Sequence, residues 1–237
     1  MDKSISREVN EHILEIRYKP NARVLDFRGE LAASISQHME LTEWRIDANR
    51  VDVHSKNQAT RVFVAFRNAG AVLRNTSLPD YFPNQATKFT RHLFTLKPLS
   101  DPVAVERLGV RSRFAILSPL PLNDLLHQFE TKVLNVSKEA LTAFDARLID
   151  IGAPLNFETK SGRINTNSGP MEREQLARFF EFEKNENLPE VALYLEFDYW
   201  LRPTEPLSVK EIVTLIKLYA DENWQRHLRL RSLVLGG

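Results

Sequence analysis

The chain has 237 residues, of which 43% are hydrophobic and 27% are charged, with a formal net charge of +1. This length supports one large or two small domains, and the composition excludes a disordered chain. No apolar run approaches the ~20 residues that a membrane-spanning helix requires, so we expect no membrane partner. The absence of cysteine excludes disulfides and thiolate zinc sites. The residues from Met1 to Ser6 have no apolar segment behind their charges, which predicts a cytoplasmic protein without a secretory signal.

Hydrophobic periodicity predicts mixed helices and strands in the first half of the chain. Alternation places Leu14, Ile16 and Tyr18 on the core face of the first strand. The elements expected in chain order are a strand over 12–17, a helix over 22–39, an antiparallel meander over 44–53, 61–66 and 71–74, a helix over 84–93 and a strand over 108–117.

The second half predicts two short helices and a closing strand and helix. The elements expected in chain order are helices over 123–134 and 137–144, a strand over 146–151, a polar hairpin or loop over 156–170, a strand over 191–201 and a helix from 208 to about 230. The segment 173–182 fits either a helix or a strand. Ser208 and Glu211 form a capping box, in which each side chain bonds the amide of the other residue.

A strand-turn-helix pattern occurs near both ends of the chain. Leu14–Tyr18 and Leu195–Tyr199 have nearly the same sequence, a proline-bearing turn follows each, and a glutamate lies twelve residues beyond each tyrosine. We therefore expect an α+β protein with two similar halves, 1–118 and 119–237, each an antiparallel sheet with a long helix packed on one face.

Motifs for metals, nucleotides and nucleophilic catalysis are missing. The six histidines have no metal-ligand spacing, neither a phosphate-binding loop nor a dinucleotide turn occurs, and no G-x-S-x-G elbow is present. We expect no metal, no cofactor and no catalytic set, which favours a non-enzymatic protein. A hydrolase assembled from distant Ser, His and Asp residues remains the enzyme alternative.

Arginines form the most suggestive polar pattern. Arg107, Arg111 and Arg113 alternate on one side of a predicted strand, and Arg61, Arg67 and Arg74 on the meander would widen this set. Guanidinium groups in a row can follow a phosphate backbone or bind a protein partner. On the alternative interpretation the arginines pair with acidic residues across the same sheet, namely Asp47, Asp52 and Glu15.

Two further groups of residues are candidates for a functional role. Glu196 and Asp198 lie two residues apart and share a strand face, a geometry that suits a general acid and base but is also common on solvated strands. The aromatics Tyr194, Trp200 and Trp224 crowd the second half. They are candidates for a protein interface, although core packing also explains them.

The order of these parts resembles a sporadically distributed bacterial protein family of uncharacterised function and about this length. Arg107–Arg111 and Leu195–Tyr199 carry the resemblance, which covers nearly the whole chain. The sequence departs from the family pattern at Ser112–Phe114, where members have an aromatic residue and an asparagine, and at Glu196, where aspartate is usual. The resemblance implies no activity, cofactor or catalytic residue.

These patterns predict a bacterial accessory protein that recognises a protein partner through an open sheet face or edge, in a stress or phage-defence system. The alternative is a nucleic-acid-binding protein that contacts the phosphate backbone through the arginine-lined strand. Residues 1–118 carry an excess of cations and 119–237 an excess of anions, which would also allow two copies to dock head to tail as a homodimer.

Overall fold

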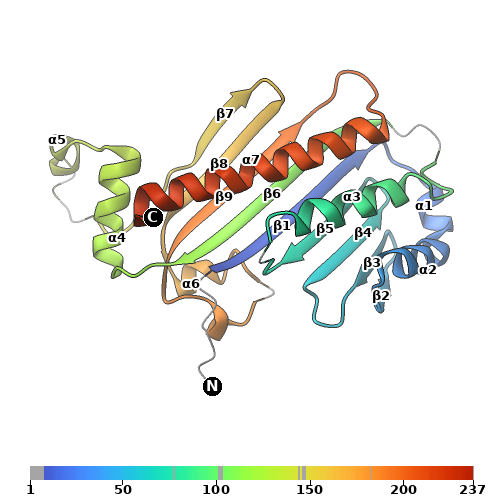
Figure 1. Ribbon diagram of the computed structural model, residues 1–237, viewed down its shortest axis with the longest axis horizontal. Helices are drawn as coiled ribbons and strands as arrows, with labels where there is room; N and C mark the ends of the chain where they lie inside the picture. Colours follow the sequence, from blue (N-terminus) through green and yellow to red (C-terminus); the bar gives the residue numbers. More distant parts are fainter. Residues whose placement is uncertain are drawn as a thin grey trace.

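The computed structural model describes residues 8–76, 78–100, 104–143, 145, 148–181 and 183–236, so the prediction made on Met1 to Ser6 lies outside it. Its nine strands form one antiparallel sheet in the order β2-β3-β4-β5-β1-β6-β9-β8-β7 (Figure 1). The strands are β1 (Glu8–Tyr18), β2 (Glu43–Ile46), β3 (Arg50–His54), β4 (Thr60–Ala65), β5 (Asn68–Arg74), β6 (Val105–Leu117), β7 (Leu155–Thr159), β8 (Gly162–Glu172) and β9 (Val191–Leu201).

Helices gather mainly on one face of this sheet (Figure 1). The helical segments are α1 (Arg23–Asp26), α2 (Arg28–Met39), α3 (Tyr81–Leu93), α4 (Leu122–Phe129), the π-helical turn η1 (Glu130–Leu134), α5 (Lys138–Thr142), α6 (Arg173–Leu176), the 3-10 turn η2 (Asn185–Asn187) and α7 (Val209–Leu235). The α+β class is therefore confirmed.

Strand β1 is the middle strand of the nine, and β6 lies directly beside it. In register, Glu11 lies opposite Arg113 of β6 and Arg74 of β5. Leu14, Ile16 and Tyr18 of β1 point to the helices and are fully buried, as the alternation predicts. The alternate residues of β1 point to the opposite face, since successive side chains of a strand change sides.

The long helix α7 crosses the sheet and packs against β6, β9 and α3. Its start confirms the predicted capping box: Ser208 Oγ accepts from the Glu211 amide at 3.2 Å, and Glu211 Oε2 accepts from the Ser208 amide at 2.7 Å. Ile212, Ile216 and Tyr219 are buried against the sheet. Helix α2 packs instead against β2, β3 and α3, so the two repeated strand-turn-helix units differ in where their helix lies.

Three apolar clusters form the core. The largest lies beneath α2, α3 and the first half of α7, and the second lies beneath α4 and the C-terminal half of α7. The third joins Tyr194 and Ala115 to Leu176 and Phe180 on the opposite face of the sheet, where α6 covers its lower end (Figure 1).

One prediction for the middle of the chain needs correction. Residues 148–151 form a loop, and 146 and 147 of the predicted strand lie outside the described residues. Of the two alternatives for the polar segment 156–170, the hairpin is correct: the segment forms most of β7–β8, and β8 is also paired with β9. In the ambiguous segment, α6 settles residues 173–176 as helix, because a capping box between Glu172 and Gln175 starts it.

Candidate functional site

The sheet face opposite α3 and α7 carries charged side chains from four neighbouring strands. We call it the charged face: Arg74 of β5, Glu11, Glu15 and Arg17 of β1, Arg107, Arg111 and Arg113 of β6, and Glu196 and Asp198 of β9. These positions alternate with buried apolar residues, so the two-residue period of a strand brings them to one side. The three arginines of β6 share a face, as their spacing predicts.

The charged face is a continuous chain of ion pairs. Arg74 and Arg113 both bind Glu11, at 3.0 and 3.1 Å, and Arg113 also binds Glu196 at 2.8 Å. Arg111 links Glu196, at 3.8 Å, to Asp198, at 3.2 Å. The series of ion pairs continues through Arg107 and Arg17.

At its other end, Arg107 bridges Asp198, at 3.2 Å, and Glu15, at 2.8 Å. Arg17 closes the chain on Glu15 at 2.9 Å. Five guanidinium groups thus alternate with four carboxylates across β5, β1, β6 and β9. Because cation and anion alternate, most of the charge is compensated within the face.

Burial and pairing act on the pKa values of this face in opposite directions. Burial alone would raise the pKa of Glu15, but hydrogen bonds from Arg17 and Asn68 outweigh it, and the pKa is lowered. Burial would likewise lower the pKa of Arg113, yet Glu196 keeps it above its ordinary value. Both groups therefore hold their charge firmly. The pKa of Tyr194 is raised, first by burial and then by Glu196, so its hydroxyl stays protonated and donates to Glu196 Oε2 at 2.7 Å.

A smaller ion-pair group continues the charged pattern toward the β2 edge. Asp52 of β3 binds Arg50 and Arg61, each at 2.7 Å. The Arg50 guanidinium also lies 4.1 Å from the centre of the Phe63 ring, a cation–π distance. Arg61 is thus engaged with an acid rather than free for a phosphate.

A hollow of about 230 Å³ lies at the centre of the charged face. Ile13 and Phe63 form its apolar part, and charged groups of both signs line the rest: Glu15, Arg17, Arg107, Arg111 and Asp198. The hollow exists because Gly109 has no side chain between Arg107 and Arg111. Gly70 leaves room for the Phe63 ring, since a Cβ there would come within 2.8 Å of that ring and 2.1 Å of the Leu14 carbonyl oxygen.

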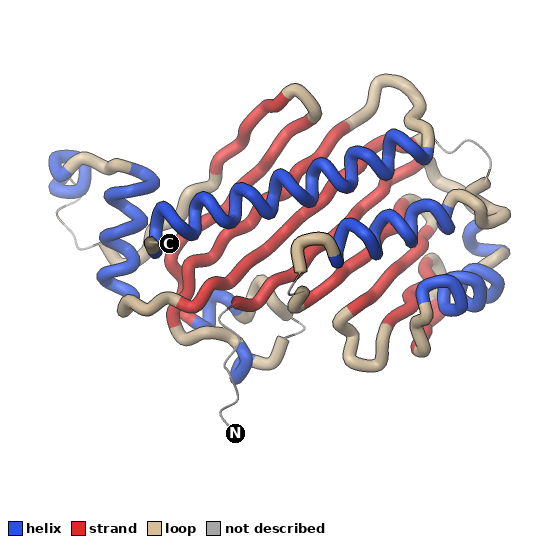
Figure 2. The backbone as a smooth tube through the Cα atoms, in the orientation of Figure 1, coloured by secondary structure: helices blue, strands red, loops and turns tan. Residues whose placement is uncertain are grey.

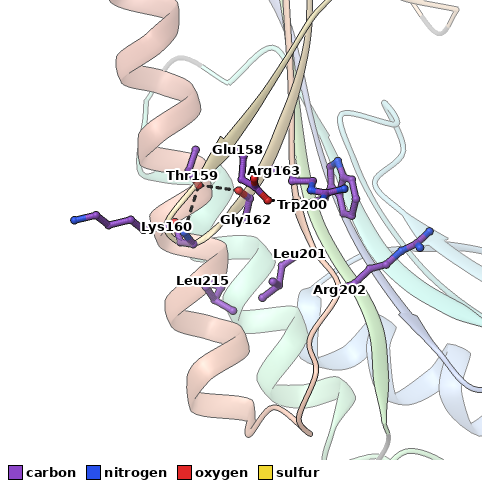
Figure 3. A pocket seen from close by; sticks show the side chains of 10 residues that line it. Glu158, Thr159, Lys160, Gly162, Arg163, Trp200, Leu201, Arg202 and Leu215 are labelled. Carbon is purple, nitrogen blue, oxygen red and sulfur yellow. Dashed lines mark hydrogen bonds and ion pairs between the residues drawn. The ribbon is translucent and has the colours of Figure 1, made fainter.

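Exposed cations surround the end of β9. A cavity of about 550 Å³ is lined there by Lys160, Arg163, Trp200 and Arg202 (Figure 3). The guanidinium carbons of Arg107, Arg163 and Arg202 lie 5.4–5.7 Å from the indole ring. The indole N–H has no hydrogen-bond partner among the described residues. Glu158 lines the same cavity, so this end also carries both signs of charge.

The three aromatics expected at an interface have different positions. Tyr194 is fully buried in the third cluster under α6. Trp224 packs against Phe114 and His227 beneath α7 and serves the core. Trp200, in contrast, lines the cavity at the end of β9.

The arginines largely follow the alternative interpretation from the sequence. Glu15 pairs with Arg107 and Asp52 pairs with Arg61, whereas Asp47 pairs with Arg45. Most arginines of the charged face are held by acids that were not predicted as their partners, namely Glu11, Glu196 and Asp198. The remaining candidate, Arg67, is exposed where the chain turns from β4 into β5.

The sequence already carried a signal for the missing acids. Glu196 and Asp198 have the same two-residue spacing as Arg111 and Arg113, so antiparallel pairing sets each acid directly opposite an arginine. The carboxylate oxygens of Glu196 and Asp198 accept hydrogen bonds from these guanidinium groups. Neither acid lies on a solvated strand face, which was one of the two expectations for this pair.

Within the described ranges, no group of three or more His, Cys, Asp or Glu side chains could hold a metal ion. Among the helices of that same part of the chain, none is long and apolar enough to cross a membrane. Comparison with models of known protein families gave no match, and comparison with curated proteins gave no significant one. The resemblance carried by Arg107–Arg111 and Leu195–Tyr199 therefore stays a prediction.

Proposed function

We propose that this protein is a non-enzymatic binding protein that recognises a protein partner through the charged face. The continuous chain of alternating arginines and carboxylates carries the proposal. Helices α3 and α7 lie on the other side of the sheet, and α6 covers only one end of this side. A partner surface with a complementary order of charges could replace several of these pairs at once.

The physical argument concerns specificity. Guanidinium groups already held by carboxylates lose little conformational freedom on binding, so a partner meets a preorganised pattern. Complementary charges across an interface select the partner and its orientation more than they add affinity. Arg111 has the greatest exposure of the β6 arginines, 36%, and sits at the rim of the central hollow. It is the residue that a partner carboxylate would reach first.

Nucleic acid is the second candidate, and the basic end of the sheet favours it. Arg163 and Arg202 lie exposed around Trp200, where a base could stack, and Lys19 lines the neighbouring cavity. Phosphate recognition relies on cations whose counterions are released. The charged face fits this poorly, because its arginines are compensated by Glu11, Glu15, Glu196 and Asp198.

Replacing Arg111 by glutamate tests the leading proposal. The tagged chain and its Arg111→Glu and Arg45→Glu variants would be purified from the native host. We expect a partner protein to co-purify in stoichiometric amount with the parent chain and with Arg45→Glu, because Arg45 lies on the exposed edge strand β2. We expect Arg111→Glu to lose this partner. Retention of the partner by Arg111→Glu, or a chain that stays alone and monomeric, would contradict the proposal.

The nucleic-acid alternative has its own measurement. Affinity for a single-stranded oligonucleotide should then fall steeply with salt and drop when Arg163 and Arg202 become alanine. Absence of binding at low salt would reject it.

We also propose that the two halves share an order of elements. A central strand, a helix, an antiparallel meander and a returning helix occur as β1 to α3 and again as β6 to α7. This order supports an internal repeat in which β1 corresponds to β6. In the repeat expected from the sequence, the strand that ends at Tyr18 corresponded instead to the strand that ends at Tyr199. The expected setting in a stress or phage-defence system stays a prediction.

A further inference from the structure

The helix layer leaves one side of the sheet uncovered. Helices α2, α3 and α7 lie side by side over the strands from β2 to β9, while the hairpin β7–β8 extends beyond α7 (Figure 2). Helix α4 packs against β8 and closes one end of the strip that α7 leaves open. A helix about 10 Å wide spans two strands spaced about 4.8 Å apart. The uncovered strip over β7 and β8 therefore has the width of one helix.

Apolar side chains line this strip. Leu155 and Phe157 of β7 point to the same face as Ile164 of β8, because Phe157 lies opposite Ile164 in the register. Together with Leu230 of α7 and Val133 of η1 they border a groove of about 470 Å³. Leu155 is 44% exposed and Phe157 is 50% exposed. Adjacent exposed apolar residues of this kind mark an interaction site.

Cations from α7 stand along the groove. Arg226 and Arg229 line it, and Arg229 is exposed. Arg226 binds Glu222 through Nη2 at 2.6 Å and lies over the Tyr199 ring, yet its Nη1 is buried without a hydrogen-bond partner among the described residues. A carboxylate brought into the groove would satisfy this donor.

We propose that the groove receives an amphipathic helix of a partner protein, with leucine-like side chains on one face and a glutamate or aspartate on the flank that meets Arg226 and Arg229. The five residues of β7 span about 17 Å, which corresponds to about three helical turns. The apolar face would follow the spacing i, i+3, i+4, i+7. The occupant completes the helix layer as a fourth helix beside α7.

Charge argues against a second copy of this chain as the occupant. The apolar residues exposed on the C-terminal part of α7, Leu228 and Leu233, are flanked by Arg229 and Arg231. Docking that face into the groove of another copy would bring arginines against Arg226 and Arg229, which repel one another. An acidic helix from a different protein has the complementary charge.

The groove lies on the helix-bearing side, opposite the charged face, so the two proposals fail separately. A displayed library of about fourteen-residue helical peptides would be selected on the full chain. The peptides that bind would then be measured by fluorescence anisotropy. We expect them to share the apolar spacing and an acidic flank, and to lose at least about tenfold in affinity on Phe157→Glu.

Further variants complete the test. Leu155→Glu should weaken binding as Phe157→Glu does, and Arg229→Glu should reverse the preference from acidic to lysine-bearing peptides. Trp44→Glu alters an exposed aromatic on the opposite edge of the sheet, and Arg111→Glu alters the charged face; both should leave affinity unchanged. No selected peptide, or peptides insensitive to Phe157→Glu, would overturn the proposal. Self-association lost on Phe157→Glu would assign the groove to a second copy instead.

Discussion

Arg113 of β6 and Glu196 of β9 lie directly opposite one another, and Nε of the arginine donates to Oε2 of the glutamate at 2.8 Å. The same guanidinium also holds Glu11, a side chain only 7% exposed. Removing the arginine would leave Glu11 with Arg74 alone, and Glu196 with Arg111 alone at 3.8 Å. Arg113 therefore joins the three strands β1, β6 and β9 at the centre of the sheet.

We expect Arg113→Met to lower the free energy of unfolding by about 3 kcal/mol, the usual cost of breaking a buried pair from one side. Arg45→Met is the matched control: Arg45 pairs with Asp47 on β2 with its side chain 75% exposed, and exposed pairs contribute less than about 1 kcal/mol. Urea denaturation measures both. Equal losses in the two variants would contradict a structural role for the ion-pair chain.

Gly70 should tolerate no side chain. An alanine Cβ would lie 2.1 Å from the Leu14 carbonyl oxygen and 2.8 Å from the Phe63 ring, and overpacking of this kind costs about 1–3 kcal/mol or more. Gly29 in α2 has no atom within 4 Å of such a Cβ, so Gly29→Ala should instead stabilise by about 0.5–1 kcal/mol. Thermal unfolding would show opposite shifts. A Gly70→Ala protein as stable as the parent would show that both the β1 backbone at Leu14 and the Phe63 ring can move.

Asn223 of α7 is fully buried and donates from Nδ2 to the carbonyl oxygens of Val110 and Phe197, at 3.1 and 3.3 Å. Asn223→Asp keeps the shape but replaces the donor by an acceptor that faces two acceptors. We expect a loss of about 3 kcal/mol or more at neutral pH. Gln225→Glu adds the same charge on the exposed side of α7 and should change stability little. Equal unfolding curves for the two variants would argue against this position for Asn223.

His12 should make stability depend on pH. Burial lowers its pKa to about 4 from 6.5; Glu8 acts in the opposite direction and His227 in the same one. The unfolded chain then binds the proton more readily, so the free energy of unfolding falls as the pH decreases from about 6.5 to about 4. A full shift of this size corresponds to up to about 3 kcal/mol.

His12→Gln should flatten this part of the profile, measured by urea unfolding between about pH 7 and about pH 4.5. Loss of the Glu8 carboxylate charge, whose pKa is lowered by His227 against the effect of burial, adds a further decrease at the acid end in both proteins. His54→Gln, on the edge side of the sheet, is the control. Coinciding profiles for His12→Gln and the parent would contradict the prediction.

Local signals were enough to predict some elements from the sequence. The residues of β9 alternate in polarity, and Ser208 and Glu211 start α7 through bonds between near neighbours, so both elements were expected where they occur. The order of strands was not accessible in the same way. Pairing of β1 with β6 joins residues about a hundred positions apart, and tertiary packing, not local pattern, selects it.

The hairpin β7–β8 was expected only as one of two alternatives, and its pairing with β9 was not predicted. Residues such as Asn165 and Asn167 gave this segment the composition of a loop. A strand that is covered on both faces needs apolar residues, but β8 lies beside a strip without a helix and carries polar groups on its other face. The candidate site was predicted in part: the arginines of β6 were found, while the burial of Glu11 and Glu196 depends on the strand order.

The central position of β1 has a consequence for the growing chain. During synthesis, β1 to α3 emerge and can pair before β6 exists, which leaves one edge of β1 with open hydrogen-bonding groups. Open edges of this kind are templates for aggregation. Strand β6, residues 105–117, pairs with this edge of β1. The other edge of β6 pairs with β9, which begins more than seventy residues later in the chain. Pairings so distant in sequence form slowly, so this open edge persists until the last strands have left the ribosome.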